Sequence, residues 1–410
     1  MFLLSKYKKA FQILGFISAA FLFGFLIYHF FFRSISAPLE TLPTGTSTPG
    51  SRLPQAGGSS GQAGVGEGGS GILETGGISE QKGDNIANGG LTKTQLLSSE
   101  ESFGQKLAQD GSIEFYNKKD GRFYRLDSDG ESQALSDKVF YDVQNVYWAP
   151  VGDKAILEYP DGANILYNFK TEKQVTLPSH WQDYDFAPTG DQVVMKSMGT
   201  DASNNWLAIA NDDGTGSKAI EPLGENGDQV FPSWSPNKQS VALYVESTGL
   251  NQQEVIFIGL NNENFTAMTI EGRGFKYLWS PRGDRLLYSI FSSASDLKPV
   301  LWAANAQSES IGSGRKNLQV ETWADKCVYA DAESVYCAVP DKIEEGAGLY
   351  PELGNSTPDK VYLVNTYTGL KKLIAIPEIP VSMHNLMLSE NGRNLYYSDP
   401  AGKIYKIRLE

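Results

Sequence analysis

Three hydrophobic patterns follow one another along the chain. From Ala10 to Phe32 the residues are almost all apolar and carry no formal charge. From residue 33 to 93, Gly, Ser, Thr and Pro dominate and no aromatic residue occurs. Short β-rich runs then alternate with turn residues from 94 to 410. The patterns predict an N-terminal segment at 1–9, a transmembrane helix at 10–32, a flexible linker at 33–93 and an all-β domain at 94–410.

The apolar stretch is long enough to span a membrane. As a helix it would rise roughly 34 Å, against a hydrocarbon core of roughly 30 Å. Lys6, Lys8 and Lys9 precede it and only Arg33 follows closely. Positive flanks stay in the cytoplasm, so we expect the rest of the chain to be exported. A cleaved signal peptide is the alternative, because 34–37 offers small residues for cleavage, but signal cores span only roughly 7–15 residues.

The linker composition is that of a tether. A Gly-rich segment without aromatic residues buries too little apolar surface to offset its chain entropy, so we expect disorder. A G-x-S-x-G match runs from Gly57 to Gly61. It lacks the strand–turn–helix context of a nucleophile elbow, so it indicates no catalytic serine.

A phrase recurs through the β-rich part: a run ending in Trp or Phe, then Ala/Ser-Pro, a turn with Gly or Asp, and a second run. Clear copies are VYWAPVGDKAILEY from Val146, YDFAPTGDQVVMKS from Tyr184, PSWSPNKQSVALYV from Pro232 and YLWSPRGDRLLYSI from Tyr277. Weaker copies are LAQDGSIEFY from Leu107, CVYADAESVYCAV from Cys327 and LMLSENGRNLYYS from Leu386. Their spacing of about 40–60 residues is typical of four-stranded propeller blades.

Each part of the phrase has a physical role. Proline lacks an N–H and ends the first strand, while Gly or Asn supplies the hairpin turn. The preceding aromatic residue is suited to pack between neighbouring sheets. Two more β-rich runs follow, for example 163–169 and 173–178, so each unit should hold four antiparallel strands, a to d from the inside outward. We therefore predict a seven-bladed β-propeller; six or eight blades also fit, because the first, sixth and seventh copies lack the proline phrase.

The last copy predicts how the ring closes. It supplies strands a to c at 385–389, 394–399 and 403–409, and no fourth strand follows. Residues 94–98 resemble an outer strand such as 132–136. We expect 94–98 to pair beside 403–409, which joins both ends of the domain and removes an open edge.

The W-[SA]-P-x-G-x-x-[LIV] phrase, together with an Asp-Asp-Gly turn at 212–214, resembles the TolB-like, WD-repeat-like β-propeller family over residues 94–410. A similar propeller forms the N-terminal domain of dipeptidyl-peptidase and prolyl-oligopeptidase enzymes. The resemblance implies a fold and little about function, because packing and turn residues carry it.

The net charge and the few histidines narrow the range of possible functions. A formal net charge of −13 without a basic stripe argues against nucleic acid as a partner. The three histidines are His29, His180 and His384, and neither of the two outside the apolar stretch has an evident Ser or Asp motif nearby. A hydrolytic triad needs a base beside its nucleophile. We therefore expect no catalytic residues, no cofactor and no enzymatic activity.

A metal in the central channel is the better catalytic alternative. Aligning the copies places Asn145, Asp183 and Asn385 at equivalent inner-strand positions near the channel mouth, where other copies have Phe231 or Lys276. Calcium requires about six to eight oxygen ligands, so these positions favour polar residues at a wet channel mouth over a metal site. The Asp-rich segments 127–130 and 212–214 lack the bidentate Glu of a calcium loop and are expected to be c–d hairpin turns.

The only cysteines, Cys327 and Cys337, flank the turn of the sixth copy. Paired across a hairpin, they also place Tyr329 opposite Val335. In an exported domain this favours a cross-strand disulfide over two buried thiols.

Connection lengths predict which face is functional. We expect short a–b and c–d turns on one face, called here the a–b/c–d face. The opposite b–c/d–a face should carry the longer connections 199–204, 223–230, 247–252, 292–298 and 341–359. Long loops on a rigid scaffold are where binding residues concentrate. The candidate partner-binding residues on this face are His180, Trp181, Glu225, Asn226, Arg273, Tyr350 and His384.

The sequence thus predicts a membrane-anchored, extracytoplasmic propeller that binds a protein, peptide or envelope polymer. A propeller hydrolase or lyase with a channel-bound metal, and a purely structural envelope subunit, are the alternatives.

Overall fold

The computed structural model describes residues 22, 25, 82–261, 263 and 265–410. The chain divides into two units, 1–76 and 77–410. Of the predicted span 10–32 only Leu22 and Phe25 are described, both helical, and most of the predicted linker lies outside the described residues. Within the described positions, no helix combines the length and apolar character needed to traverse a bilayer.

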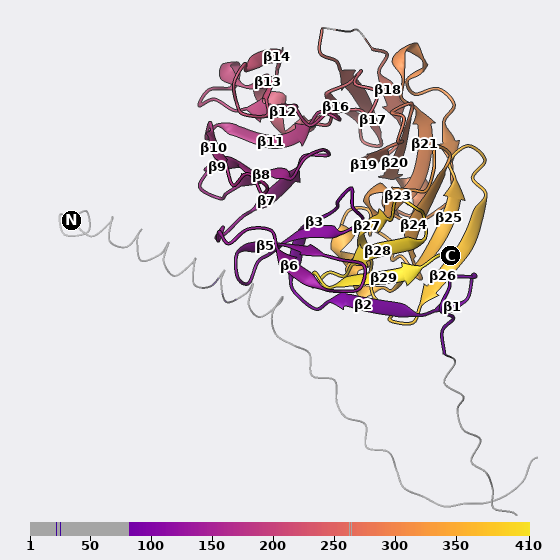
Figure 1. Ribbon diagram of the computed structural model, residues 1–410. Helices are drawn as coiled ribbons and strands as arrows, with labels where there is room; N and C mark the ends of the chain where they lie inside the picture. Colours follow the sequence, from indigo (N-terminus) through magenta and orange to yellow (C-terminus); the bar gives the residue numbers. More distant parts are fainter. Residues whose placement is uncertain (1–21, 23–24, 26–81, 262, 264) are drawn as a thin grey trace, which may run out of the picture. The chain divides into compact units, whose positions relative to one another are not determined.

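Seven sheets, antiparallel except for the added strand of blade 6, form a propeller (Figure 1). Blade 1 holds β3 (Ser102–Leu107), β4 (Ile113–Asn117), β5 (Arg122–Leu126) and β6 (Ser132–Ala134). Blade 2 holds β7 (Asn145–Trp148), β8 (Lys154–Glu158), β9 (Asn164–Asn168) and β10 (Gln174–Leu177). Blade 3 holds β11 (Trp181–Phe186), β12 (Gln192–Ser197), β13 (Trp206–Asn211) and β14 (Lys218–Pro222). Blade 4 holds β15 (Val230–Pro232), β16 (Ala242–Gly249), β17 (Gln252–Ile258) and β18 (Met268–Ile270).

The remaining blades complete the ring. Blade 5 holds β19 (Arg273–Trp279), β20 (Arg285–Phe291), β21 (Val300–Asn305) and β22 (Lys316–Asn317). Blade 6 holds β23 (Cys327–Tyr329), β24 (Ser334–Pro340), β25 (Asp359–Asn365), β26 (Lys371–Pro377) and the added β1 (Leu91–Thr92). Blade 7 holds β27 (His384–Leu388), β28 (Asn394–Ser398), β29 (Ile404–Arg408) and β2 (Thr94–Ser98). The 3-10 helices in the connections are η2 (Ala202–Asn204), η3 (Gly224–Gln229), η4 (Ser293–Ser295), η5 (Ser308–Ser310), η6 (Ala324–Lys326) and η7 (Pro351–Ser356).

The recurring phrase forms the a–b hairpin of each blade. Gly152, Gly190 and Gly283 adopt positive φ angles in these turns, which glycine tolerates because it has no Cβ. Blade 4 has no glycine in its turn, and Lys238 takes the left-handed conformation with φ 62°. The turn therefore forms in blade 4 as well, with a less favourable residue.

In blades 2 and 5 the Trp of the phrase connects the blade to its predecessor. The Trp148 indole donates to Gly104 O of blade 1 at 2.7 Å, and its ring lies edge-on to Phe123 at 5.6 Å. Trp279 makes the same kind of contact with blade 4, donating to Ser233 Oγ at 2.9 Å. The predicted packing between blades is thus observed.

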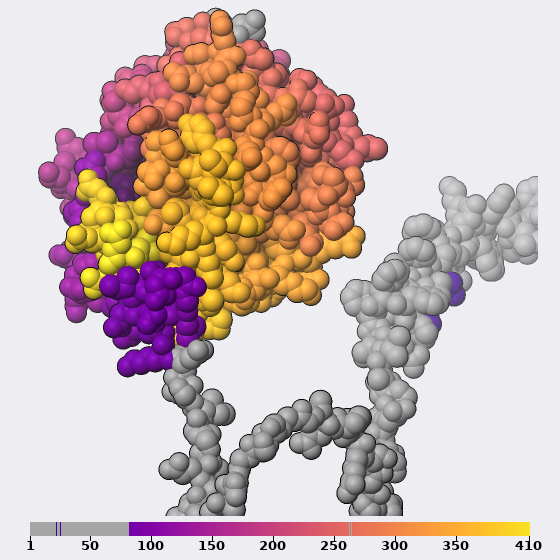
Figure 2. All heavy atoms as spheres, turned by 90° about the vertical axis from the view of Figure 1, so that its right-hand side faces the viewer, coloured from indigo at the N-terminus to yellow at the C-terminus, as the bar shows by residue number. Residues whose placement is uncertain are grey.

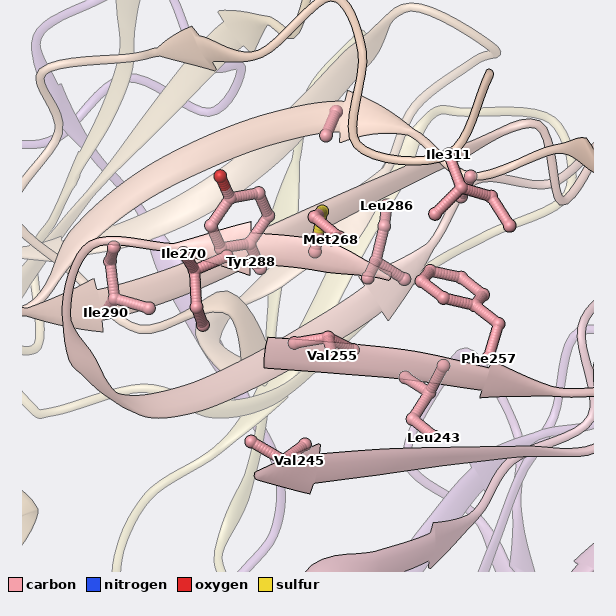
Figure 3. Close-up of a cluster of buried hydrophobic side chains, with 12 residues drawn as sticks. Leu243, Val245, Val255, Phe257, Met268, Ile270, Leu286, Tyr288, Ile290 and Ile311 are labelled. Atoms are coloured by element: carbon pink, nitrogen blue, oxygen red, sulfur yellow. The ribbon is translucent and has the colours of Figure 1, made fainter. Parts of the chain in front are cut away.

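The core consists of layers between adjacent sheets. Figure 3 shows one of them, in which apolar side chains of blade 4 such as Val255 and Phe257 face Leu286 and Tyr288 of blade 5. All seven residues of β20 are buried, so this strand packs on both sides. Burying apolar surface between every pair of neighbours is what makes the ring cohesive.

The predicted ring closure is confirmed. β2 pairs antiparallel with β29, from Thr94 opposite Ile407 to Ser98 opposite Ile404. Figure 2 shows the first residues of the domain, in indigo, beside the yellow C-terminal residues. With this pairing blade 7 has four strands and the ring has seven blades, which settles the six-or-eight alternative.

One strand lies inside the predicted linker. β1 pairs in parallel with β26, Leu91 opposite Ile376 and Thr92 opposite Pro377, and covers the outer edge of blade 6. The linker was expected to extend to residue 93, so its last residues belong to the propeller instead. A strand of only two residues is too short to show the alternation of side chains from which strands are predicted.

Candidate functional site

The b–c and d–a connections lie together on one face, as predicted, but the length contrast is less regular than expected. β16 and β17 continue to Gly249 and Gln252, so the predicted loop 247–252 is a tight hairpin. Conversely, the c–d connections of blades 4 and 5, residues 259–267 and 306–315, are long although they lie on the a–b/c–d face. The clearest departure from the blade pattern is the segment 341–358, between β24 and β25 of blade 6, called here the insertion.

The insertion is folded against blade 5. Gly346 N donates to Asp296 O at 3.1 Å, and Gly348 N donates to Leu297 O at 2.8 Å. Both acceptor residues have positive φ, 52° and 56°, an unfavourable conformation for non-glycine residues. A Cβ at Gly348 would lie 2.5 Å from the Phe291 ring, so only glycine permits this approach. The b–c loops of two blades therefore form one ordered structure.

The insertion leaves apolar side chains in solvent. Leu349, Tyr350 and Leu353 are 51%, 59% and 44% exposed. Acidic residues Glu344, Glu345 and Glu352 accompany them and are exposed as well. Apolar side chains held by a fixed backbone lose little further entropy on contact, which suits them to binding.

The three channel-mouth candidates occupy two environments. Asp183 and Asn385 begin β-bulges in strands β11 and β27, with φ of 52° and 49°. Asn145 lies in regular pairing opposite Glu158 and donates to its Oε2 at 2.7 Å. Asn145 and Asp183 line one cavity between blades 2 and 3, whereas Asn385 lines another between blades 7 and 1. The three equivalent positions thus line two separate cavities.

The candidate partner residues differ in exposure. His180, Glu225, Asn226 and Tyr350 are exposed on the b–c/d–a face. Trp181 is 5% exposed and packs in the core between blades 2 and 3. A side chain with this burial is held by packing, and the alternation of β11 places it inward.

Arg273 and His384 each start an inner strand and are partly buried. The Arg273 guanidinium donates to Gly249 O at 3.0 Å, which fixes it against the blade 4 hairpin. His384 lines two cavities, of about 400 and 200 Å³, and Asn355 of η7 lines both as well. Burial and the nearby Lys326 lower the pKa of His384, so its imidazole stays neutral at pH 7.

A buried ion pair lies beneath the insertion. Lys326 Nζ is 2.6 Å from Asp359 Oδ2, and the side chains are 6% and 0% exposed. Burial lowers the pKa of Lys326 and raises that of Asp359, because low polarity disfavours both charges. Asp359 also accepts from Met383 N at 2.6 Å and so joins η6, β25 and the d–a connection before blade 7. Sequence reasoning missed this pair because its members are far apart in the chain.

The structure also places a hydroxyl near His384. Ser382 Oγ lies 3.5 Å from His384 Nε2 and 3.2 Å from Lys326 Nζ, and Ser382 is 3% exposed. A nucleophile must be reachable by its substrate, and this oxygen is enclosed. No group of three or more potential metal-ligating His, Cys, Asp or Glu residues occurs among the residues that the structure describes.

Cys327 and Cys337 form a disulfide, as favoured from the sequence. They face each other across β23 and β24, with Tyr329 opposite Val335 as expected. The Asp-rich segments are c–d turns: Asp127 Oδ1 accepts from Asp129 N and Glu131 N, both at 2.9 Å. Asp212 pairs with Lys154 of blade 2.

Comparison with known proteins identifies the fold. No protein-family model matches the sequence. No curated protein matches it either. Many solved structures do match, however. A streptogramin B lyase has a TM-score of 0.51 at 10% identity, with 77% of this chain and 97% of the lyase covered.

Two other matches are TolB from Acinetobacter baumannii and the tricorn protease. TolB has a TM-score of 0.43 at 12% identity and covers 66% of this chain, which spans 64% of TolB. The tricorn protease has a TM-score of 0.49 at 11% identity and covers 77% of this chain, which spans 34% of the protease. The chain has the β-propeller fold that the sequence resemblance implied, and at these identities the likeness concerns the fold alone.

Proposed function

We propose that this propeller is a binding module that holds a protein, peptide or envelope polymer against its b–c/d–a face, outside the cytoplasm and anchored by residues 10–32. One observation carries the proposal: the insertion is fixed to blade 5 and yet exposes Leu349, Tyr350 and Leu353. A rigid loop that presents adjoining apolar groups to water is typical of an interaction site.

Charge and redox chemistry support the proposed location. The lysines before the apolar stretch favour a cytoplasmic N-terminus and an exported propeller. The Cys327–Cys337 disulfide fits an oxidising compartment, where such bonds persist. A C-terminal tag on the full chain should therefore react with a membrane-impermeant reagent in intact cells. Labelling only after lysis would contradict the topology.

The enclosed Ser382 hydroxyl favours binding over hydrolysis beside His384, because a nucleophile must be open to its substrate. A metal-dependent hydrolase or lyase would need several ligands converging from different blades, whereas Asn145 and Asn385 line separate cavities.

The test of binding uses crosslinking in native membranes. The full chain would be compared with a variant carrying Leu349→Ser, Tyr350→Ser and Leu353→Ser. The control carries Val151→Ser and Leu370→Ser, which are 45% and 74% exposed on the a–b/c–d face. We expect the crosslinked partner to disappear in the insertion variant and to remain in the control. Identical crosslinks in both variants would refute the proposed face.

A further inference from the structure

A second feature of the b–c/d–a face is a polar cavity of about 270 Å³ between blades 2 and 3. It is formed by the start of β7, the end of β8, the following b–c turn, the start of β9, the d–a connection at Ser179 and the start of β11. The residues used below are Asn145, Glu158, Asn164, Trp181, Gln182 and Asp183.

Asn164 belongs to the wall of the cavity and connects the two blades that form it. The residue is 1% exposed, and its Nδ2 donates to Trp181 O at 2.6 Å. Its Oδ1 is buried and accepts no hydrogen bond in the described protein, although it belongs to a residue that lines the cavity. Native proteins rarely leave a buried acceptor unpaired, because its desolvation is then uncompensated. This oxygen is itself enclosed, so the polar groups that a ligand can reach are those of the neighbouring cavity residues.

Glu158 is the second polar group, and it is held in place. The residue is 9% exposed, and its Oε2 accepts from Asn145 Nδ2 at 2.7 Å and from Tyr147 OH at 3.1 Å. Both bonds end on the same oxygen of the carboxylate. Its orientation is thus set before a ligand arrives, which lowers the entropy cost of binding.

The charge of Asp183 at the rim is balanced. Its Oδ2 lies 2.5 Å from Lys196 Nζ, and Lys196 also donates to Gly227 O at 3.0 Å. Beside Asp183, Gln182 contributes an amide that can both donate and accept. The cavity therefore offers amide and carboxylate oxygens together with amide N–H groups, and little apolar surface.

We propose that this cavity binds the hydroxyl groups of one sugar residue in a neutral glycan. Hydroxyls both donate and accept, and so match a mixed lining; an ammonium group only donates and an apolar group does neither. At roughly 30 Å³ per water molecule, the volume equals about nine waters, which is the scale of one sugar ring and far more than one metal ion needs. The inference rests on the proposed function because the cavity lies on the same b–c/d–a face. It involves no residue of the insertion.

The test is titration calorimetry of the full chain with cellohexaose, maltohexaose and chitohexaose. We expect at least one to bind, and Glu158→Gln and Gln182→Ala each to weaken that binding about tenfold or more. Asp183→Asn is a further variant that keeps the bulge, because Asn tolerates positive φ. The matched control is Glu246→Gln in β16, the corresponding strand of blade 4, which should leave the affinity unchanged. Thermal unfolding of each variant confirms that it is folded.

Three results would overturn the proposal: no binding of any hexasaccharide at millimolar concentration, equal weakening by Glu246→Gln, or binding of calcium alone that Glu158→Gln abolishes. If sugar binding fails while insertion-dependent crosslinks persist, only this inference falls and the proposed function stands. Sugar binding without such crosslinks would support the cavity and reject the role of the insertion.

Discussion

Blades 4 and 6 show two ways of holding a four-stranded unit in the same ring. Blade 6 has a disulfide between its two inner strands, a buried ion pair and a fifth strand along its edge. Blade 4 has inner and outer strands of three residues each. The blade that carries the long insertion is the one with the most reinforcement. A loop of this length costs chain entropy on ordering, and the additional contacts of blade 6 offset that cost.

Blade 4 is attached through its neighbours instead. Asp185 of blade 3 accepts from Trp234 N at 2.5 Å, and Trp279 of blade 5 donates to Ser233 Oγ. These bonds reach its inner segment from both sides, where its own strand is short. The difference teaches that a blade without internal reinforcement depends on side chains of adjacent blades.

The strongest test of the reinforcement is Asp359→Ala. Removing the carboxylate leaves the Lys326 ammonium buried without a counter-charge, which should cost about 3–5 kcal/mol of unfolding free energy. Urea unfolding of the full chain measures it. Asp341→Ala is the control, because Asp341 pairs with Lys360 at 2.8 Å in a partly exposed position and should cost less than about 1 kcal/mol. Equal losses would mean that the buried pair stabilises blade 6 no more than a partly exposed pair does.

The second test removes the disulfide. The double variant Cys327→Ser and Cys337→Ser releases a constraint between residues ten positions apart, and we expect a loss of about 3 kcal/mol. Urea unfolding with and without a reductant checks the value, because reduction of the unmodified protein should give a similar loss. If neither treatment shifts the transition, blade 6 does not rely on this bond.

The third test concerns the attachment of blade 4 and its dependence on pH. Burial raises the pKa of Asp185 to about 6, from an ordinary value of 3.8. The folded state therefore keeps this proton at a pH where the unfolded state has lost it, and stability falls as pH rises from about 4 to about 6. Asp185→Asn does not titrate, so relative to the unmodified protein it should gain about 2 kcal/mol between pH 4.5 and 7.

Thermal or urea unfolding at several pH values compares the two proteins. Parallel stability curves over this range would show that Asp185 ionises in the folded protein as it does in water. Blade 4 would then not depend on a buried carboxyl of its neighbour.

The fold was predictable because its information is local and repeated. The phrase around Trp148, with its proline and glycine, specifies a hairpin whatever the rest of the chain does. The closing strand 94–98 was found because blade 7 lacked a fourth β-rich run. The position of β1 was not predictable, since two residues show no periodicity. The tight hairpin at 247–252 also differed from expectation, because β propensity alone does not tell where paired strands end.

The site was predictable at the level of a face and less so at the level of residues. Long connections identified the insertion, and alignment of the copies brought Asn145 and Asp183 to one cavity. Trp181 was expected near a partner, yet it is buried, because a residue at a strand start can point inward or outward. Asn164 and Glu158 escaped notice because each belongs to an ordinary strand, and the cavity that they line forms only where blade 3 packs beside blade 2.

The pairing of β2 with β29 also bears on synthesis. The segment 94–98 leaves the ribosome roughly three hundred residues before 404–408. Until then its backbone N–H and C=O groups have no partner strand to pair with. A nascent chain interrupted anywhere before residue 404 would leave the segment 94–98 without its partner strand and the last blade made without a following neighbour. Final locking of the ring thus waits for the synthesis of β29, and products truncated before this strand are expected to be recognised by proteases as open chains.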